Sequence, residues 1–302
     1  MSLAPLRRAT PTDLVLLLST VTMWAGAFVA IKLAVPSLGP LGVATARAVI
    51  GILVLAPFFF RADHLSSGAE PFAWGTLFVL AQLNITLPFV AISWAETRVD
   101  AGVAALLMGV GPLLAIVGAH LFLEDERINR QRLGGVMLGF LGVATLVGLS
   151  AVDGVAAGDH LAHAALLFAS LCYVTAGLLV RRLDMPPLTL AISTLALAAV
   201  VLLPATAFVG LGDEPMDGTA WAAIIFLGVF PTGLAYLLRY YLIQRIGYTT
   251  FAVGINMIPV IGLLLGVALL GEELTGRSVL ALCLILAGVA VARRATPEKA
   301  ST

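Results

Sequence analysis

The sequence predicts an all-α integral membrane protein with ten transmembrane helices, arranged as two inverted five-helix repeats. Three observations predict this fold. First, the 302 residues are 60% hydrophobic and only 11% charged, whereas a soluble domain carries about 25% charged residues. Second, apolar runs of the length that crosses a bilayer, about 20 residues, recur along the whole chain. Third, landmarks of the first half return 147 residues later, as Pro112 does at Pro259.

Composition and charge exclude several classes of function. The chain is electrically neutral, with 17 basic and 17 acidic residues, and it has no basic block that would bind nucleic acid. Its two cysteines, Cys172 and Cys283, lie in apolar runs without metal-ligand spacing. The histidines are scattered, and no nucleotide-binding loop motif occurs. We therefore expect no metal, no cofactor and no ATP-driven step.

Ten apolar segments qualify as membrane helices when the chain is divided at charges, prolines and glycines. The first run, residues 14–31, follows a short basic start and precedes more such runs, which predicts a retained membrane helix rather than a cleaved signal peptide. Long runs without alternation argue against membrane strands. The expected helices are 13–35, 40–60, 72–94, 101–122, 132–150, 160–180, 187–210, 219–242, 249–270 and 276–293.

The positions of the basic residues predict the orientation. With the N-terminus in the cytoplasm, the outer links carry only Arg98 and Arg277. The asymmetry follows the positive-inside rule and places both termini in the cytoplasm. The inner segments then carry twelve basic residues: Arg7, Arg8, Arg61, Arg127, Arg130, Arg132, Arg181, Arg182, Arg245, Arg293, Arg294 and Lys299.

The second half of the chain repeats the first. Pro40 and Pro187 are also 147 residues apart. Each half, 1–150 and 151–302, holds five expected helices, and an odd number forces the halves to insert with opposite orientations. Inverted repeats place the substrate site near the bilayer midplane, between the halves. We expect the fourth and ninth helices to meet there as symmetry mates.

Several short motifs follow one another in a specific order. The first expected helix contains MWAGAFVAIK, the second opens with GPLGVATARAVIGILVL, and GEELT joins the ninth helix to the tenth at residues 271–275. In this order and duplication, the chain resembles the EamA-type branch of the drug/metabolite transporter superfamily over nearly its whole length. The resemblance implies a multi-pass permease of the bacterial inner (plasma) membrane, often an exporter of amino acids, with a central cavity. Aromatic amino acid exporters are the closest type, although no motif fixes that substrate.

Polar residues inside the expected helices are few, and they are candidates for substrate binding because a bilayer makes them costly. Arg47 lies too deep in the second helix for simple snorkelling. It is either a structural donor to helix-end carbonyls or a contact for a carboxylate-bearing metabolite. Asn84 is favoured over Gln82 as the cavity-facing residue of the third helix. Asn256 lies three residues before Pro259 in the ninth helix.

Aromatic residues are expected to wall the cavity. Trp94 is equally compatible with an anchor at the membrane interface, which is the role favoured for Trp74 and Trp221 at helix starts. Lys32, near the outer end of the first helix, is equally compatible with snorkelling and with a cavity role. The expected wall residues are Trp24, Phe28, Trp94, Tyr173, Tyr236 and Tyr240.

Two prolines lie inside expected membrane helices, and no aspartate or glutamate is expected deep in one. Pro112 and Pro259 fall inside expected helices, where each removes a hydrogen bond and creates a kink or hinge. Glu96 is assigned to an outer link, and Glu126 and Glu273 are assigned to caps of the fifth and tenth helices. Proton-coupled exchange through a buried carboxylate is therefore not expected.

These features favour a secondary transporter that moves small metabolites, amino acids first, by alternating access. A drug or nucleotide-sugar carrier of the same fold is the alternative within this class. A membrane enzyme acting on lipid-linked substrates is disfavoured, because the one polar cluster, residues 124–132, is explained as a positive-inside anchor. We expect no catalytic residues. The expected partners are a small-molecule substrate and membrane lipid, and the chain is compatible with a monomer.

Overall fold

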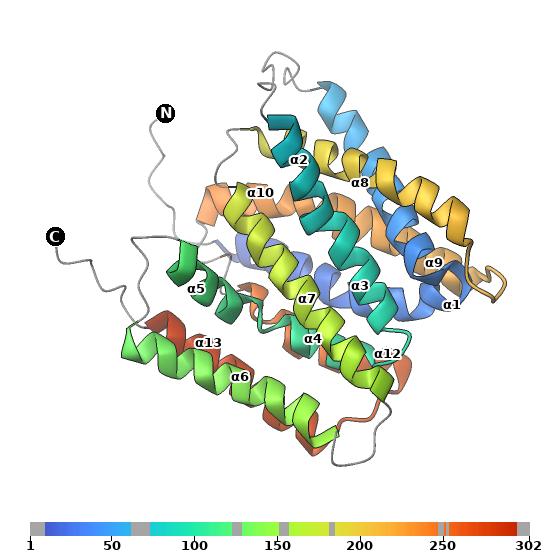
Figure 1. Ribbon diagram of the computed structural model, residues 1–302. Coiled ribbons are helices and arrows are strands. Elements are labelled where there is room, and N and C mark those ends of the chain that lie inside the picture. The colour runs from blue at the N-terminus through green and yellow to red at the C-terminus, as the bar shows by residue number, and fades with distance from the viewer. Residues whose placement is uncertain are drawn as a thin grey trace.

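The computed structural model is helical throughout its described part (Figure 1). Residues 10–61, 73–122, 129–150, 157–180, 185–246, 251 and 254–294 are described, and no strand occurs among them. The expectation of an all-α membrane protein is confirmed. Six helical stretches are long and apolar enough to cross a membrane, and two shorter apolar helices accompany them at Ile258–Leu270 and Gly276–Ala292. The six stretches are Pro11–Phe59, Trp74–Ala95, Ala101–Gly118, His160–Gly177, Pro187–Val209 and Gly218–Arg239.

The first helix, α1 (Pro11–Arg61), is 51 residues long and changes direction in its middle. About 20 residues already cross the hydrocarbon core, so α1 is too long for a single span. It breaks at Gly39, where φ is 65° and ψ is 167°. Glycine suits this position because it adopts a positive φ without a Cβ clash. The two arms of α1 in Figure 1 match the expected helices 13–35 and 40–60.

Two expected helices are continuous but contain a π-helical segment. Each π segment inserts one residue into the helical register, which re-aims the side chains around it. The expected helix 72–94 comprises α2 (Ala73–Ala81), η2 (Gln82–Thr86) and α3 (Leu87–Ala95), and the expected helix 219–242 comprises α9 (Gly218–Leu227), η3 (Gly228–Leu234) and α10 (Ala235–Ile246).

The two proline-bearing helices are interrupted before their prolines. α4 (Ala101–Met108) ends in a turn, and α5 (Gly111–Phe122) begins directly after it. A turn at residues 256–257 likewise precedes α12 (Ile258–Leu270). Pro112 and Pro259 are therefore second residues of new helices. The expectation that each removes a mid-helix hydrogen bond is wrong, because first-turn N–H groups have no intrahelical partner to lose.

The irregular segments recur at the 147-residue spacing. Residues 82–86 of η2 correspond to residues 229–233, which lie within η3. The turn at 109–110 corresponds to the turn at 256–257. The same spacing relates the start of α5 to the start of α12. Apart from Pro112 and Pro259, the side chains differ between these pairs, so the recurrence lies mainly in the backbone path, as a duplication predicts.

Glycines set the closest contacts between helices. α6 (Arg130–Ser150) and α13 (Gly276–Arg294) lie side by side in Figure 1. A Cβ built on Gly135 would lie 2.6 Å from the carbonyl oxygen of Gly288. α4 and α12 meet in the same way, since a Cβ on Gly109 would collide with Pro259. The expectation that the fourth and ninth helices meet is confirmed.

Candidate functional site

Arg47 is the buried cation around which the candidate site is built. It lies on the second arm of α1 with 6% of its surface exposed. Its Nε donates a hydrogen bond to Thr232 Oγ1 at 3.2 Å, and its guanidinium carbon lies 3.6 Å from the centre of the Phe89 ring. Neither terminal guanidinium nitrogen has a hydrogen-bond partner among the described residues. Within the described part of the structure, no group therefore occupies the two outer donors of this buried Arg.

Two other predicted site residues lie within electrostatic range of this guanidinium, and a third is hydrogen-bonded to one of them. Asn84 Nδ2 donates to the Tyr236 hydroxyl at 3.4 Å. The hydroxyl groups of Tyr173 and Tyr236 interact electrostatically with Arg47. Tyr173 lies on α7 (Ala157–Val180), so the group draws on four separate expected helices. Residues far apart in sequence thus form one polar group inside an apolar bundle.

The π segments position this group. Asn84 lies in η2, and Thr232 lies in η3. The Thr232 hydroxyl donates to the Leu227 carbonyl at 2.8 Å and still accepts from Arg47. Gly228 and Gly233 let η3 approach α1 closely, because a Cβ on either would collide with Ile50 or Val54.

Sequence reasoning missed two members of the group, Thr232 and Phe89. A signal for the first was available in GVFPTGL at residues 228–234, where proline and glycine inside an apolar run indicate an irregular helix. Nothing in the sequence separates Phe89 from the other phenylalanines of the membrane helices.

Trp24 and Phe28, both predicted to wall the cavity, make packing contacts on the first arm of α1. Trp24 Nε1 donates to the Pro231 carbonyl oxygen at 3.1 Å, and its ring meets Phe251 edge to face at 6.1 Å between ring centres. Phe28 is buried in the largest hydrophobic cluster. Trp24 therefore ties α1 to a carbonyl of η3, that of the residue directly before Thr232, the Arg47 partner.

Trp94 lies apart from the Arg47 group. Its ring is covered by the Arg98 guanidinium, whose carbon lies 4.1 Å from the ring centre. It lines an open cavity of about 490 Å³, together with the bend of α1 and the residues that follow α8 (Pro187–Val209). The lining residues are Val35, Pro36, Gly39, Pro40, Leu41, Trp94, Val209, Gly210, Leu211, Gly212 and Asp213.

The last two predicted residues lie on the second half of the chain. Asn256 occupies the turn before α12, and its buried Oδ1 accepts no hydrogen bond from the described residues. Tyr240 lies on α10, but its side chain is outside the described part of the structure. Neither is placed beside Arg47 by a described contact.

Lys32 is half-buried, and its ammonium group binds the backbone at the end of α3. Its Nζ donates to the carbonyl oxygens of Glu96 at 2.8 Å and Val99 at 2.7 Å. These carbonyls belong to the end of α3 and the link that follows, where no helical partner is available. Lys32 thus fastens α1 to the α3–α4 link.

A carboxylate from the second half caps a helix of the first half. Glu272 accepts hydrogen bonds from the backbone nitrogens of Ala101 at 2.6 Å and Gly102 at 2.8 Å. The expectation that Glu273 caps the tenth helix is wrong. Glu273 is exposed, and Thr275 Oγ1 accepts from the Ser278 nitrogen at the start of α13 instead. Glu126 lies outside the described residues.

Replacing Glu272 by glutamine should lower the stability of the protein by about 1 kcal/mol, because charge-assisted capping of the α4 N-terminus is weakened. The thermal unfolding midpoint of the purified protein in detergent measures this loss. Glu273→Gln is the matched control, since its side chain is exposed and should leave the midpoint unchanged. Equal midpoints for both variants would show that the Glu272 contacts stabilise nothing.

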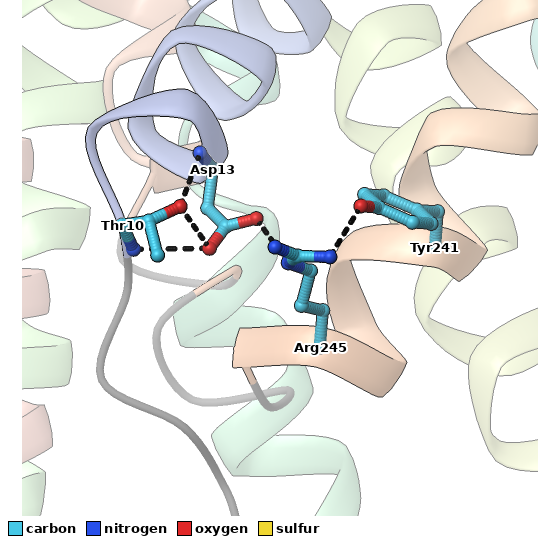
Figure 2. Close-up of polar contacts among 4 residues, drawn as sticks. All are labelled: Thr10, Asp13, Tyr241 and Arg245. Atoms are coloured by element: carbon cyan, nitrogen blue, oxygen red, sulfur yellow. Dashed lines mark hydrogen bonds and ion pairs between the residues drawn. The ribbon is translucent and has the colours of Figure 1, made fainter.

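A second set of contacts links the halves at the start of α1, the other end of its first arm from Lys32 (Figure 2). Arg245 Nε of α10 lies 2.6 Å from Asp13 Oδ1. The other oxygen, Oδ2, accepts from the backbone nitrogen and the hydroxyl of Thr10 at 2.9 and 2.7 Å. The Tyr241 hydroxyl accepts from Arg245 Nη1 at 2.7 Å. The start of the first expected helix is thereby bound to the end of the eighth.

Glu96 corrects the expectation that no carboxylate is buried. It follows α3 and was assigned to an exposed link, yet its side chain is 0% exposed. The Lys32 bonds hold α1 against the backbone of this link, at the carbonyl oxygens of Glu96 itself and of Val99. Asp100 in the same link is exposed, as expected.

The chain matches one protein-family model twice. The model describes the EamA-like transporter family and matches residues 12–148 and again residues 160–294. A solved crystal structure superposes with a TM-score of 0.67 at 19% identity, covering 94% of this chain and 98% of the other, which shows a shared fold.

Relatives along most of the chain carry transporter names. An uncharacterized transporter of Archaeoglobus fulgidus is 29% identical over 93% of this chain and 98% of its own. The threonine/homoserine exporter RhtA of Salmonella typhimurium is 29% identical over 91% of this chain and 88% of its own. A protein of Streptantibioticus cattleyicolor named "Probable terminal-alkyne amino-acid exporter" is 24% identical over 93% of each chain. With two family matches that together span most of its length, the chain belongs to the EamA-like transporter family of membrane permeases.

Proposed function

We propose that the protein exports amino acids, or closely related small metabolites, across the bacterial inner membrane. The observation that carries the proposal is the buried Arg47, whose terminal nitrogens have no hydrogen-bond partner among the described residues. Tyr173 and Tyr236 lie within electrostatic range of it, and Asn84 is hydrogen-bonded to Tyr236. A guanidinium binds a carboxylate through paired hydrogen bonds, which are stronger than neutral ones. The amide and hydroxyl groups suit the other polar atoms of a small metabolite. The names of two relatives support amino acids as the substrate class.

We further propose ten membrane spans in two inverted halves, residues 1–150 and 151–302, with both termini in the cytoplasm. Three findings support this arrangement: the double family match, the recurrence of irregular segments at one spacing, and the basic residues of the inner links. Trp24, Phe28, Trp94, Tyr240 and Asn256 stay predictions as further contacts of the substrate path.

Alternating access fits the contacts that join the halves. Glu272 binds the second half to the first on one side of the molecule, and Asp13 with Arg245 binds the halves on the other side. Lys32 supports the first of these sides by fastening α1 to the α3–α4 link within the first half. Opening one side of the molecule would break the contacts on that side and leave the contacts on the other side in place. The turns before Pro112 and Pro259 interrupt the two helices that cross between the halves, so they are the proposed hinges.

Transport should be tested with purified protein in liposomes. Saturable uptake of labelled threonine, homoserine or an aromatic amino acid is expected, with competition by unlabelled substrate. The absence of saturable flux across a broad amino-acid panel would contradict the proposal. A parallel growth screen separates the alternatives, because resistance to toxic amino-acid analogues supports amino-acid export, and resistance to cationic dyes supports drug efflux. Turnover of lipid-linked substrates without flux would instead indicate a membrane enzyme.

A further inference from the structure

Glu96 is a buried carboxyl group that the proposed binding site does not use. It lies one residue beyond the span Trp74–Ala95, and its side chain is fully buried. Neither Oε1 nor Oε2 has a hydrogen-bond partner among the described residues. Carboxylates are almost never buried without partners, since removing the charge from water costs several kcal/mol or more. A neutral carboxyl group tolerates such a place at far lower cost.

The charged groups around Glu96 do not supply the missing partner. Lys32 directs its ammonium group to two backbone carbonyls, one of them that of Glu96 itself. Glu272 is a second carboxylate in the neighbourhood, and it is held by the α4 N-terminus. Arg47 interacts with Glu96 only as a further positive charge. α3 packs on α1 and α7, and the remaining titratable groups of those two helices are Asp13, Arg61, Asp159, His160, His163, Cys172 and Tyr173.

Burial raises the pKa of the Glu96 carboxyl well above its usual range. Lys32 lowers this pKa, the Glu272 carboxylate raises it again, and Arg47 lowers it. Burial is the largest of these effects, so the raised pKa depends on the closed packing around Glu96. When water reaches the group, the pKa should return toward its ordinary range, and the proton should leave.

We propose that Glu96 is a proton-binding site, and that the side of the transporter fastened by Lys32 and Glu272 closes only after Glu96 has taken up a proton. The proton comes from the water on that side, and the carboxylate becomes a neutral carboxylic acid. Opening reverses the step. The outward orientation of this side rests on the proposed topology, but the link between protonation and closure does not.

The sign of the pH dependence follows from this linkage. The closed form binds the proton more tightly than the open form. Rising pH therefore shifts the equilibrium toward the open form, by up to about tenfold per pH unit for one proton. A Glu96→Gln variant is permanently neutral, so its closed form should persist at every pH.

The experiment uses a thiol next to Glu96 and needs no substrate. Ser93 is fully buried and lies three residues before Glu96, on the same face of α3. We would introduce Ser93→Cys together with Cys172→Ala and Cys283→Ala, and measure the rate of maleimide labelling in lipid nanodiscs from pH 5.5 to 9. Dividing each rate by that of the same protein with Glu96→Gln cancels the intrinsic pH dependence of the thiol.

The maleimide labelling rate, divided by the rate of the Glu96→Gln variant, should rise with pH by up to about tenfold per pH unit. A ratio that does not change with pH would overturn the proposal. Glu96→Asp keeps a titratable group and should keep a rising profile, so a flat profile there would also overturn it. Glu273→Gln removes an exposed carboxylate and should behave as the parent protein does. Because no amino acid is present, failure of this test leaves the proposed export activity untouched, and absent export leaves this test valid.

Discussion

Replacing Arg47 by glutamine should reduce amino-acid transport by roughly 10- to 100-fold. Hydrogen bonds to a charged group contribute about 1.5–3 kcal/mol, and each 1.4 kcal/mol is a factor of about ten. The proposed substrate carboxylate would lose its cation and both of its donors, while the glutamine side chain still fills most of the space beside Phe89. The measurement is the initial rate of saturable uptake into liposomes, divided by the amount of correctly reconstituted protein.

Two further variants separate substrate binding from structural support. Arg47→Lys keeps the charge but loses the paired donor geometry, so it should retain transport at an intermediate rate. Thr232→Val removes the hydroxyl that holds Nε and leaves the guanidinium present, so most of the transport should remain. If Thr232→Val were as inactive as Arg47→Gln in well-folded protein, Arg47 would act through helix packing and the carboxylate contact would be rejected.

Replacing Gly135 by leucine should prevent stable folding. A Cβ at this position would lie 2.5 Å from the Ala292 nitrogen and 2.6 Å from the Gly288 oxygen, both of them backbone atoms that cannot rotate away. α6 and α13 would have to separate, at a cost of more than about 3 kcal/mol. We expect little monodisperse protein in size-exclusion chromatography after detergent extraction, and a much lower unfolding midpoint for what remains.

The adjacent residue is the matched control. Gly134 is exposed, and a Cβ there would meet nothing within 4 Å. Gly134→Leu makes the same chemical change one position away, toward lipid, and should leave yield and midpoint close to those of the parent protein. Equal damage from both substitutions would contradict the prediction, because leucine is a better helix former than glycine and only Gly135 lies at the α6–α13 contact.

Much of the fold was predictable because its signals are local. Hydropathy located the membrane helices, and the bend in α1 falls between the two helices expected there. The 147-residue spacing predicted which helices correspond, and the fourth and ninth do meet. The π segments and the turns before Pro112 and Pro259 were not predicted, since each depends on backbone geometry that several residue types tolerate.

The candidate site was predictable only in part. Arg47 and Asn84 were predicted because polar groups in apolar helices are costly, and Tyr173 and Tyr236 were predicted as aromatic wall residues. The structure places both tyrosines within electrostatic range of Arg47 and bonds Asn84 to Tyr236. Thr232 was missed because a lone threonine in a membrane helix can satisfy its hydroxyl on its own backbone. Glu96 was misjudged because a glutamate directly after a helix ordinarily reaches water.

The sequence by itself determined that this chain is an integral membrane protein. It also determined how many apolar segments the chain has and which segments of the two halves correspond. Only the tertiary structure decided which faces of those segments point inward, and so which polar groups share a site. The physical reason is that lipid tails are as apolar as a protein core. A helix that is apolar all round carries no hydropathy signal for its inner face, so close contacts such as Gly135 with Gly288, and the burial of Glu96, emerge only when the helices pack.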